Sequence, residues 1–228
     1  MDREHRDVAK TQEHSGTLTL DVNPKRWFSL RTLYQRSERN PNDYTLNLEL
    51  YPKGGSPPFP TGWEMFDEAA RTRNKSGAVM ELDASDRLSF SASFDTTDDN
   101  FHDSLYGLLG YQSFDSSAEV SYALRNDISL FVGYAFERYK SDQRSRQLSG
   151  TNNSPNNDWE SYIADRIQTF SAGISIPRIR RNVTLDAYYS LAFATGQINS
   201  RILGHPSLPG FLVTTAQDWP QTGTRSTN

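Results

Sequence analysis

The sequence predicts an all-β fold, an antiparallel up-and-down meander of the kind that closes into a transmembrane β-barrel. Two observations predict this class: apolar and polar residues alternate through eight segments, and the connections between these segments are alternately short and long. An antiparallel meander places all the short connections at one end and all the long connections at the other. Outer-membrane barrels have this arrangement, whereas a soluble β-sandwich, the alternative, usually carries loops at both ends.

The expected strands follow from the alternation, because successive side chains on a strand point to opposite faces. They span about 16–22, 27–36, 76–83, 88–96, 113–124, 128–139, 166–176 and 182–195. A ninth candidate, 44–51, lies within the first long connection. We expect a polar N-terminal segment at 1–15, barrel strands and loops at 16–195, and a loop-like, truncated C-terminal segment at 196–228.

The connections are expected to be of two kinds. The short ones are 23–26, 84–87, 125–127 and 177–182, and the long ones are roughly 37–75, 97–112 and 140–165. In a barrel of the outer membrane, the short turns face the periplasm and the long loops face outward. The sequence therefore predicts which end of the sheet lies outside the cell.

Within the strands, the alternation predicts one face toward lipid and one face toward the lumen. The residues expected to face lipid are Phe90, Phe94, Val120, Tyr122, Leu130, Val132, Tyr134, Ile174, Leu185, Tyr189 and Leu191. Those expected to face the lumen are Ser89, Ser91, Ser93, Ser121, Gly133, Ser171, Gly173, Thr184 and Ser190. The lumen set is small and mostly uncharged, so another protein could approach it closely.

The composition is compatible with this prediction. The hydrophobic fraction is 35% with a mean hydropathy of -0.72, and no segment reaches the ~18–20 apolar residues of a spanning helix. A barrel strand needs only every second residue to be apolar. Aromatic residues make up 12% of the chain and suffice for interface girdles. Trp27 and Phe28 are expected to lie at the short-turn end, and Tyr34, Phe94, Phe114 and Tyr139 near the loop end; ordinary packing in a soluble sheet is the alternative.

Charge and cysteine content exclude several classes of function. The net charge of -4 argues against a nucleic-acid partner. The compact basic cluster, Arg178, Arg180 and Arg181, is expected on a short turn, where it suits a solvated face or anchoring to anionic lipid headgroups rather than nucleic-acid binding. The sequence has no cysteine, so it can form neither a disulfide nor a thiolate metal site and cannot attach haem through C-x-x-C-H. We therefore expect no cofactor and no metal bound by this chain.

Two groups of carboxylates are weaker candidates for chemistry. Glu64, Asp67 and Glu68 could form a hydrolase pair, although nearby arginines favour ordinary ion pairs, and the protein is not expected to be an enzyme. A second group could supply oxygen ligands to Ca²⁺ from a loop but lacks the spacing and glycine of an EF-hand. Its members are Asp95, Asp98, Asp99, Asn100 and Asp103.

Four stretches together resemble the decahaem-associated outer-membrane barrels of the MtrB/PioB type. They are 65–77 (MFDEAARTRNKSG), 94–114 (FDTTDDNFHDSLYGLLGYQSF), 134–147 (YAFERYKSDQRSRQ) and 157–175 (NDWESYIADRIQTFSAGIS). The resemblance is carried by the order and spacing of the set and covers most of 16–200. Some members also carry a C-x-x-C near the mature N-terminus, which this chain lacks. The resemblance implies that the chain is a segment of a longer barrel.

The resemblance also implies a function. Barrels of this family sheathe a periplasmic multihaem c-type cytochrome and allow it to conduct electrons across the outer membrane. The expected partners are therefore this cytochrome inside the barrel and the lipid of the bacterial outer membrane outside it. A diffusion porin or other transport channel is the main alternative, and a soluble β-sandwich interaction module is a further one.

Overall fold

The computed structural model describes residues 8, 10–41, 60, 62–125, 128–146, 154–180, 183–203, 217–218 and 222–227. Nearly all of these residues form strands of one sheet, because backbone pairing runs without interruption along the alternating segments. The strands are β1 (Thr11–Lys25), β2 (Phe28–Pro41), β3 (Trp63–Glu64), β4 (Arg71–Ser85), β5 (Leu88–Asn100), β6 (Tyr106–Arg125), β7 (Ile128–Arg146), β8 (Asp158–Arg180), β9 (Val183–Ile202), β10 (Gln217–Asp218) and β11 (Thr222–Thr227). A single 3₁₀ turn, Pro155–Asn157, precedes β8.

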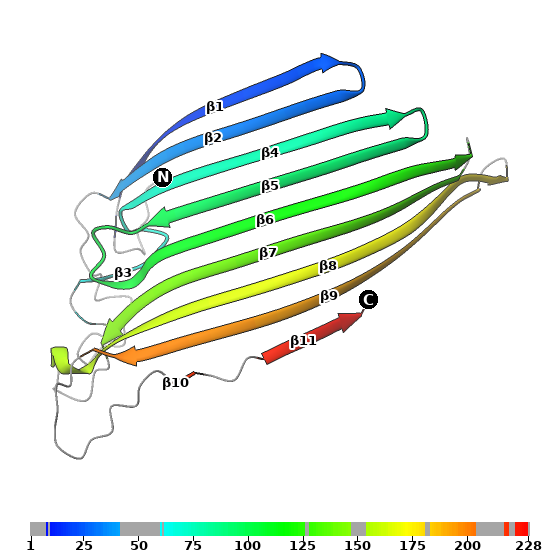
Figure 1. Cartoon of the computed structure of the whole chain (residues 1–228). Helices are drawn as coiled ribbons and strands as arrows, with labels where there is room; N and C mark the ends of the chain where they lie inside the picture. Colours follow the sequence, from blue (N-terminus) through cyan, green and yellow to red (C-terminus); the bar gives the residue numbers. More distant parts are fainter. Residues whose placement is uncertain are drawn as a thin grey trace.

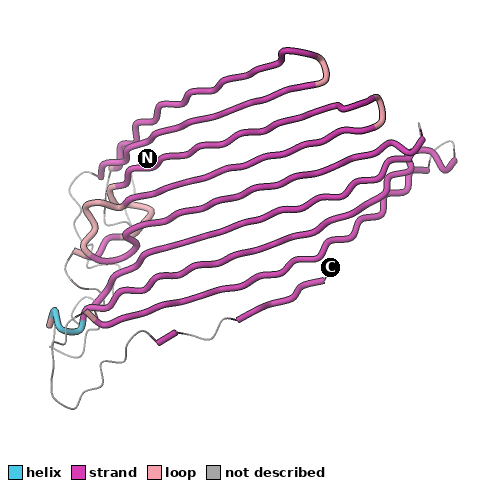
Figure 2. The backbone as a smooth tube through the Cα atoms, viewed as in Figure 1, coloured by secondary structure: helices cyan, strands magenta, loops and turns pink. Residues whose placement is uncertain are grey.

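The long strands follow one another in the sheet in chain order, each antiparallel to the next (Figure 1). The two edges lie apart in Figures 1 and 2, and within the described residues β1 pairs with β2 alone, so this part of the chain is an open sheet. No helix in the described part of the chain has the length and apolar character needed to cross a bilayer. The expected all-β, up-and-down antiparallel fold is confirmed.

The short connections share one end of the sheet, as expected (Figure 1). The connections between consecutive strands at this end run from Lys25 to Phe28, Ser85 to Leu88, Arg125 to Ile128, and Arg180 to Val183. The opposite end, here called the loop end, holds the connections 42–70, 101–105 and 147–157. The expectation of a long loop at 97–112 is wrong, since only the residues from Phe101 to Leu105 separate β5 from β6.

The strands extend further toward the loop end than the alternation predicts. β7 continues to Arg146 instead of 139, and β8 begins at Asp158 instead of 166. Both faces of these extensions are rich in polar side chains, so the apolar alternation that identifies a strand disappears while the backbone pairing continues. A prediction based on side-chain pattern therefore ends each strand too early.

The terminal segments also differ from their expected character. β1 already begins at Thr11, inside the expected polar segment 1–15. At the other end, β9 continues to Ile202, and β11 pairs with it from Thr222 to Thr227, within the segment expected to be loop-like. The expected ninth strand, 44–51, lies outside the described residues.

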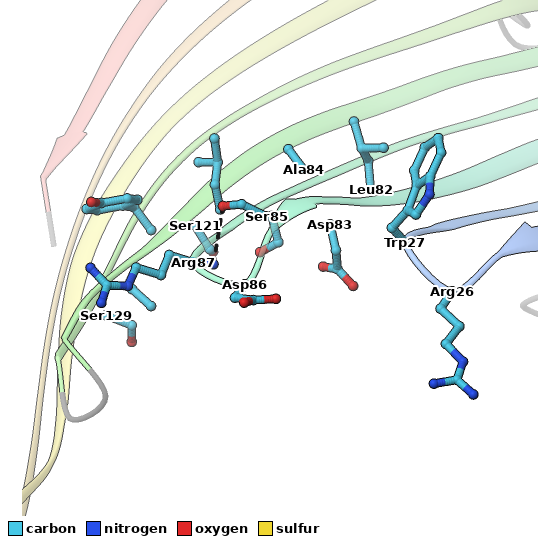
Figure 3. Close-up of a pocket in the computed structure, with 14 residues that line it drawn as sticks. Arg26, Trp27, Leu82, Asp83, Ala84, Ser85, Asp86, Arg87, Ser121 and Ser129 are labelled. Atoms are coloured by element: carbon cyan, nitrogen blue, oxygen red, sulfur yellow. Dashed lines mark hydrogen bonds between the residues drawn. The ribbon is translucent and has the colours of Figure 1, made fainter.

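The sheet is curved, and the curvature distinguishes its two faces. Figure 3 shows the short-turn end, where the hairpin ends lie along an arc around an open pocket. Trp27 and Leu82 lie on the convex side of this arc, and Asp83 and Asp86 lie on its concave side. Neighbouring residues of β4 therefore point to opposite sides of a curved wall.

The best-buried residues gather at the loop end. They include Ala69 and Ala70 before β4, Phe101 between β5 and β6, and Tyr106 at the start of β6, each at most 3% exposed. By contrast, Val132 and Tyr189 in the middle of the sheet are 63% and 54% exposed. The described chain thus has a small core at one end and a broad uncovered sheet elsewhere.

Candidate functional site

The strand register divides the long strands into two faces. One, the apolar face, contains Leu130, Val132 and Tyr134 of β7, together with the residues paired with them on neighbouring strands. The other, the serine-rich face, contains Ser129, Gly133 and their partners. Because directly paired residues share a face, the register assigns side chains of the long strands to one face or the other.

The register groups the predicted site residues as the sequence indicated. Every residue expected to face lipid, from Phe90 and Val120 to Leu191, lies on the apolar face. The residues expected to face the lumen, from Ser89 to Ser190, lie on the serine-rich face, except that Thr184 has no partner in the register. The sequence pattern thus predicted the composition of both faces, while what each face contacts remains a proposal.

On the apolar face, a row of aromatic residues forms the boundary of the apolar side chains toward the loop end. This aromatic rim consists of Tyr34, Phe94, Phe114, Phe136, Phe170 and Phe193. Phe114 and Phe136 have ring centroids 6.2 Å apart, and those of Phe170 and Phe193 are 6.4 Å apart. Beyond the rim, the same face carries polar and charged residues.

One expected girdle residue lies on the wrong face. Tyr139 pairs with Ser113 and Asp165 on the serine-rich face, opposite to Phe114 and Phe136. Its hydroxyl lies 2.7 Å from a Glu137 carboxylate oxygen and 3.1 Å from one of Asp115. Tyr139 is an odd-numbered residue of β7, whereas the residues of that strand on the apolar face are even-numbered. The alternation of β7 could therefore have identified the error.

The serine-rich face is mostly small but contains an aromatic patch. Gly173 lies between Phe131 of β7 and Tyr188 of β9 in the register. The two rings stack with centroids 6.1 Å apart and planes 21° apart. Gly173 is therefore covered by a ring, because a glycine between paired strands leaves room for a neighbouring aromatic side chain.

The two faces of β5 to β9 differ in their charged side chains. Within the described residues of these strands, the charged side chains of the serine-rich face are all acidic: Asp95, Asp99, Asp115, Glu119, Glu137, Asp165 and Asp186. Three of them, Asp95, Asp115 and Glu137, are directly opposite one another on adjacent strands. Arginine and lysine lie instead on the apolar face beyond the aromatic rim. The apolar face also carries the acidic residues Asp98, Asp142, Asp158 and Glu160, so only the serine-rich face of these strands has charges of a single sign.

The segment from Gly62 to Ala70, which precedes β4, folds over the serine-rich face at the loop end and is here called the inward-folded segment. Arg39 of β2 anchors it, donating from Nε to the Ala69 carbonyl at 2.9 Å and from Nη2 to the Phe66 carbonyl at 2.5 Å. Burial lowers the pKa of the Arg39 guanidinium. β3 adds parallel pairing of Trp63 with Tyr106. A cavity of about 960 Å³ lies beneath, lined by Trp63, Arg39, Arg73, Tyr111, Gln143 and Trp159 among others.

Two ion-pair groups stabilise the strand ends around this segment. Arg73 binds Asp99 through Nε and Nη2 at 2.6 and 2.7 Å, and this hydrogen bonding raises the pKa of Arg73. Asp158 accepts hydrogen bonds from Arg146 and from the Tyr106 hydroxyl, the latter at 2.9 Å. The bond from Arg146 holds the pKa of Asp158 below its ordinary value. Sequence reasoning missed both groups, because their members are distant in the chain and meet only through strand register.

The carboxylates considered for chemistry take structural positions. Glu64 accepts a hydrogen bond from Ser104 at 3.2 Å, and burial raises its pKa. Arg71 contacts Glu13 at 2.9 Å and Asp99 at 3.8 Å. Asp67 and Glu68 lie in the inward-folded segment, where Glu68 is fully buried.

The residues considered as Ca²⁺ ligands do not form a loop. From Asp95 to Asn100 they belong to β5 and alternate between its faces, so their oxygen atoms point in opposite directions. In the described part of the chain, no group of three or more His, Asp or Glu side chains is placed to hold a metal ion. The expected basic cluster at Arg178, Arg180 and Arg181 falls outside the described side chains.

Comparison with known proteins agrees with this geometry. The family model for outer membrane beta-barrel porins of the MtrB/PioB type matches residues 1–228. No curated protein matches the chain. An all-β meander with an apolar face, an aromatic rim and a serine-rich face is the wall of such a barrel. The chain therefore belongs to the MtrB/PioB family of outer membrane beta-barrel porins.

Proposed function

We propose that this chain forms part of a barrel wall that sheathes a multihaem c-type cytochrome and insulates it during electron transfer across the outer membrane. In this proposal the apolar face contacts lipid and the serine-rich face contacts the cytochrome. The role is structural, and the chain carries out no catalysis. The chain's own part is to hold, insulate and seal.

The apolar face has the dimensions of a membrane belt. The stretch from Leu185 to Phe193 rises about 26 Å along β9 at ~3.3 Å per residue. A tilt of about 40° reduces this rise to about 20 Å across the membrane, close to the ~25 Å apolar belt of known barrels. The aromatic rim then falls at the outer interface, where amphipathic rings are favoured.

The observation that carries the proposal is the length of the wall. β8 has 23 residues and β7 has 19, whereas about 9–11 residues cross the hydrocarbon layer. The serine-rich face continues along these extensions through Ser141, Ser145 and Ser161, and the inward-folded segment before β4 covers part of it there. A wall that continues well beyond the membrane suits an elongated protein partner better than a pore, which needs only to cross the bilayer.

Side-chain size on the serine-rich face supports close contact with a protein. Ser93 and Ser117 share a hydrogen bond across β5 and β6 at 2.8 Å, and Ser161 and Ser200 share one at 2.9 Å across β8 and β9. Hydroxyls that bond to each other do not depend on a partner protein for a hydrogen bond. Because the sequence contains no cysteine, this chain cannot attach c-type haem itself, so in this proposal the electron carriers belong to the partner.

Reconstitution of the complete outer-membrane protein in liposomes tests the proposal. Liposomes loaded with an internal electron acceptor should be reduced by an external donor only when the barrel and its cognate multihaem cytochrome are both present. Each component alone should leave the acceptor oxidised. Reduction by the cytochrome alone at the full rate would overturn the role of a sheath.

The porin description of the family favours a diffusion channel as a second candidate. The same liposomes distinguish the two functions. A barrel that admits small sugars or ions at porin-like rates, and that does not co-purify with a haem protein from its native membrane, would establish the channel instead.

A further inference from the structure

Two arginines on the apolar face lie directly opposite one another beyond the aromatic rim. Arg138 of β7 pairs with Arg166 of β8 in the register, and these strands are neighbours along their whole length (Figure 1). Lys140 lies two residues along β7 and therefore on the same face. The three cations form what we call the basic patch.

The basic patch has no anionic partner among the described residues. No carboxylate lies within ion-pair distance of Arg138, Lys140 or Arg166, although the arginines nearer the loop end, Arg144, Arg146 and Arg201, all have one. Like charges directly opposite each other on paired strands are destabilising. Arg138 instead lies over the Phe114 ring, 6.0 Å from its centroid; Arg138 and Lys140 are half-buried, and Arg166 is exposed.

The position of the basic patch relative to the apolar face identifies its surroundings. Arg138 pairs with Phe114 of the aromatic rim and follows Phe136 by two residues on the same face. Arg166 pairs with Thr195 of β9, which lies on the same face two residues beyond Phe193 of the aromatic rim. With the apolar face in lipid, the patch begins at the level of Phe114 and extends two to four residues beyond Phe136 along β7, at the depth of the headgroups. The loop end faces outward, so these headgroups belong to the outer leaflet.

We propose that the basic patch binds the phosphate groups of a phosphorylated glycolipid in the outer leaflet of the outer membrane. Guanidinium groups match phosphate oxygens bidentately, and adjacent strands hold the two arginines about 4.8 Å apart at the backbone. Lys140 adds a point charge about 7 Å along the strand. A bound phosphate removes the repulsion between the arginines, and no carboxylate in the described part of the chain is paired with them. The inference rests on the proposed orientation of the apolar face but not on the cytochrome.

The test uses the complete protein in detergent with bisphosphorylated lipid A as the probe and its dephosphorylated form as the comparison. Wild-type protein should retain the bisphosphorylated form selectively. Arg138→Gln and Arg166→Gln should each weaken its retention about fivefold, since a basic residue near an anionic lipid surface contributes about that factor. Arg166→Lys should retain most of the binding, because it keeps the charge.

The matched control is Arg201→Gln, which removes the same charge from the same face but from an arginine already paired with Glu160 at 2.8 Å. It should leave lipid retention unchanged. Excess inorganic phosphate should not displace the lipid if the apolar face contributes to binding; displacement would identify a free-phosphate site and overturn the inference. Equal retention by wild type and both glutamine variants, or retention that ignores lipid phosphorylation, would also overturn it.

A separate measurement isolates the orientation. Spin labels at Val132 and Tyr189 should be accessible to a lipid-soluble quencher, and labels at Gly133 and Ser190 should be protected. If the labels behave in this way and the lipid test fails, the proposal that the basic patch binds lipid phosphate is wrong and the membrane orientation stands. If the two sets of labels are equally accessible, the orientation itself is wrong, and the basic patch is overturned with it.

Discussion

Gly173 shows how a single residue determines packing on the serine-rich face. A Cβ at this position would collide with the Phe131 ring and would lie 2.9 Å from the Ala187 carbonyl oxygen. The backbone oxygen cannot move without disturbing the pairing of β8 with β9. We expect Gly173→Ala to lower the free energy of unfolding of the complete barrel by about 1–3 kcal/mol, the usual cost of overpacking, measured as a shift of the urea midpoint in detergent.

Gly16 is the matched control for that substitution. It also lies in a strand, β1, but an added Cβ there would meet nothing within 4 Å. Gly16→Ala should leave the unfolding midpoint unchanged or raise it slightly, because alanine restricts the unfolded chain. Equal destabilisation by the two substitutions would show that loss of glycine flexibility, rather than the contact with Phe131, sets the cost.

Asp158 gives the loop end a predictable dependence on pH. Its pKa in the folded protein lies below the ordinary 3.8, chiefly because of the hydrogen bond from Arg146. The stabilisation is therefore complete above pH ~4 and is lost as pH falls through the lowered pKa. Asp158→Asn should destabilise the loop end at neutral pH and have little effect in strong acid, as amide hydrogen exchange of Arg146 and its neighbours would measure. An effect of equal size at both pH values would contradict the ion-pair account.

The elements reveal what the sequence could and could not predict. The alternation located all eight long strands and grouped Val132 and Ser190 on opposite faces, because that pattern reflects burial and polarity residue by residue. It could not locate strand ends such as the last residues of β7, where both faces are rich in polar residues and backbone pairing alone maintains the strand. It also missed Arg39 and Asp158, since an inward-folded segment and a cross-strand ion pair depend on contacts distant in the chain.

A pair of neighbouring residues in β9 tests the assignment of faces at the level of the element. Leu191 lies on the apolar face and Ser190 on the serine-rich face. Leu191→Arg should lower the stability of the complete barrel by about 2–4 kcal/mol, since the charge enters hydrocarbon, whereas Ser190→Arg should cost much less. Refolding titrations into lipid vesicles measure both. Equal losses of folded barrel would exclude the proposed membrane orientation of β9.

At the scale of the whole molecule, the charged side chains distinguish the two surfaces of the wall. Basic residues beyond the aromatic rim suit anionic lipid under the proposed orientation, while the acidic residues of β5 to β9 give the serine-rich face of these strands a negative potential. The directly opposed Asp95, Asp115 and Glu137 repel one another. Under the proposed function, basic groups on the cytochrome surface would relieve this repulsion when the complex forms.

This charge distribution predicts that assembly with the cytochrome depends on salt. Attraction between exposed charges is screened beyond about 10 Å at 0.1 M ionic strength, so affinity should fall as salt rises. Glu119→Gln combined with Asp165→Asn removes two exposed inner carboxylates and should reduce both the affinity and its salt dependence. Asp98→Asn combined with Asp142→Asn removes two exposed carboxylates from the opposite face of β5 and β7 and should change neither. Titration of the purified barrel with its cytochrome at several salt concentrations measures this difference. Identical salt slopes for the two double variants would rule out an electrostatic role of the serine-rich face. They would not contradict the proposal that the barrel sheathes the cytochrome.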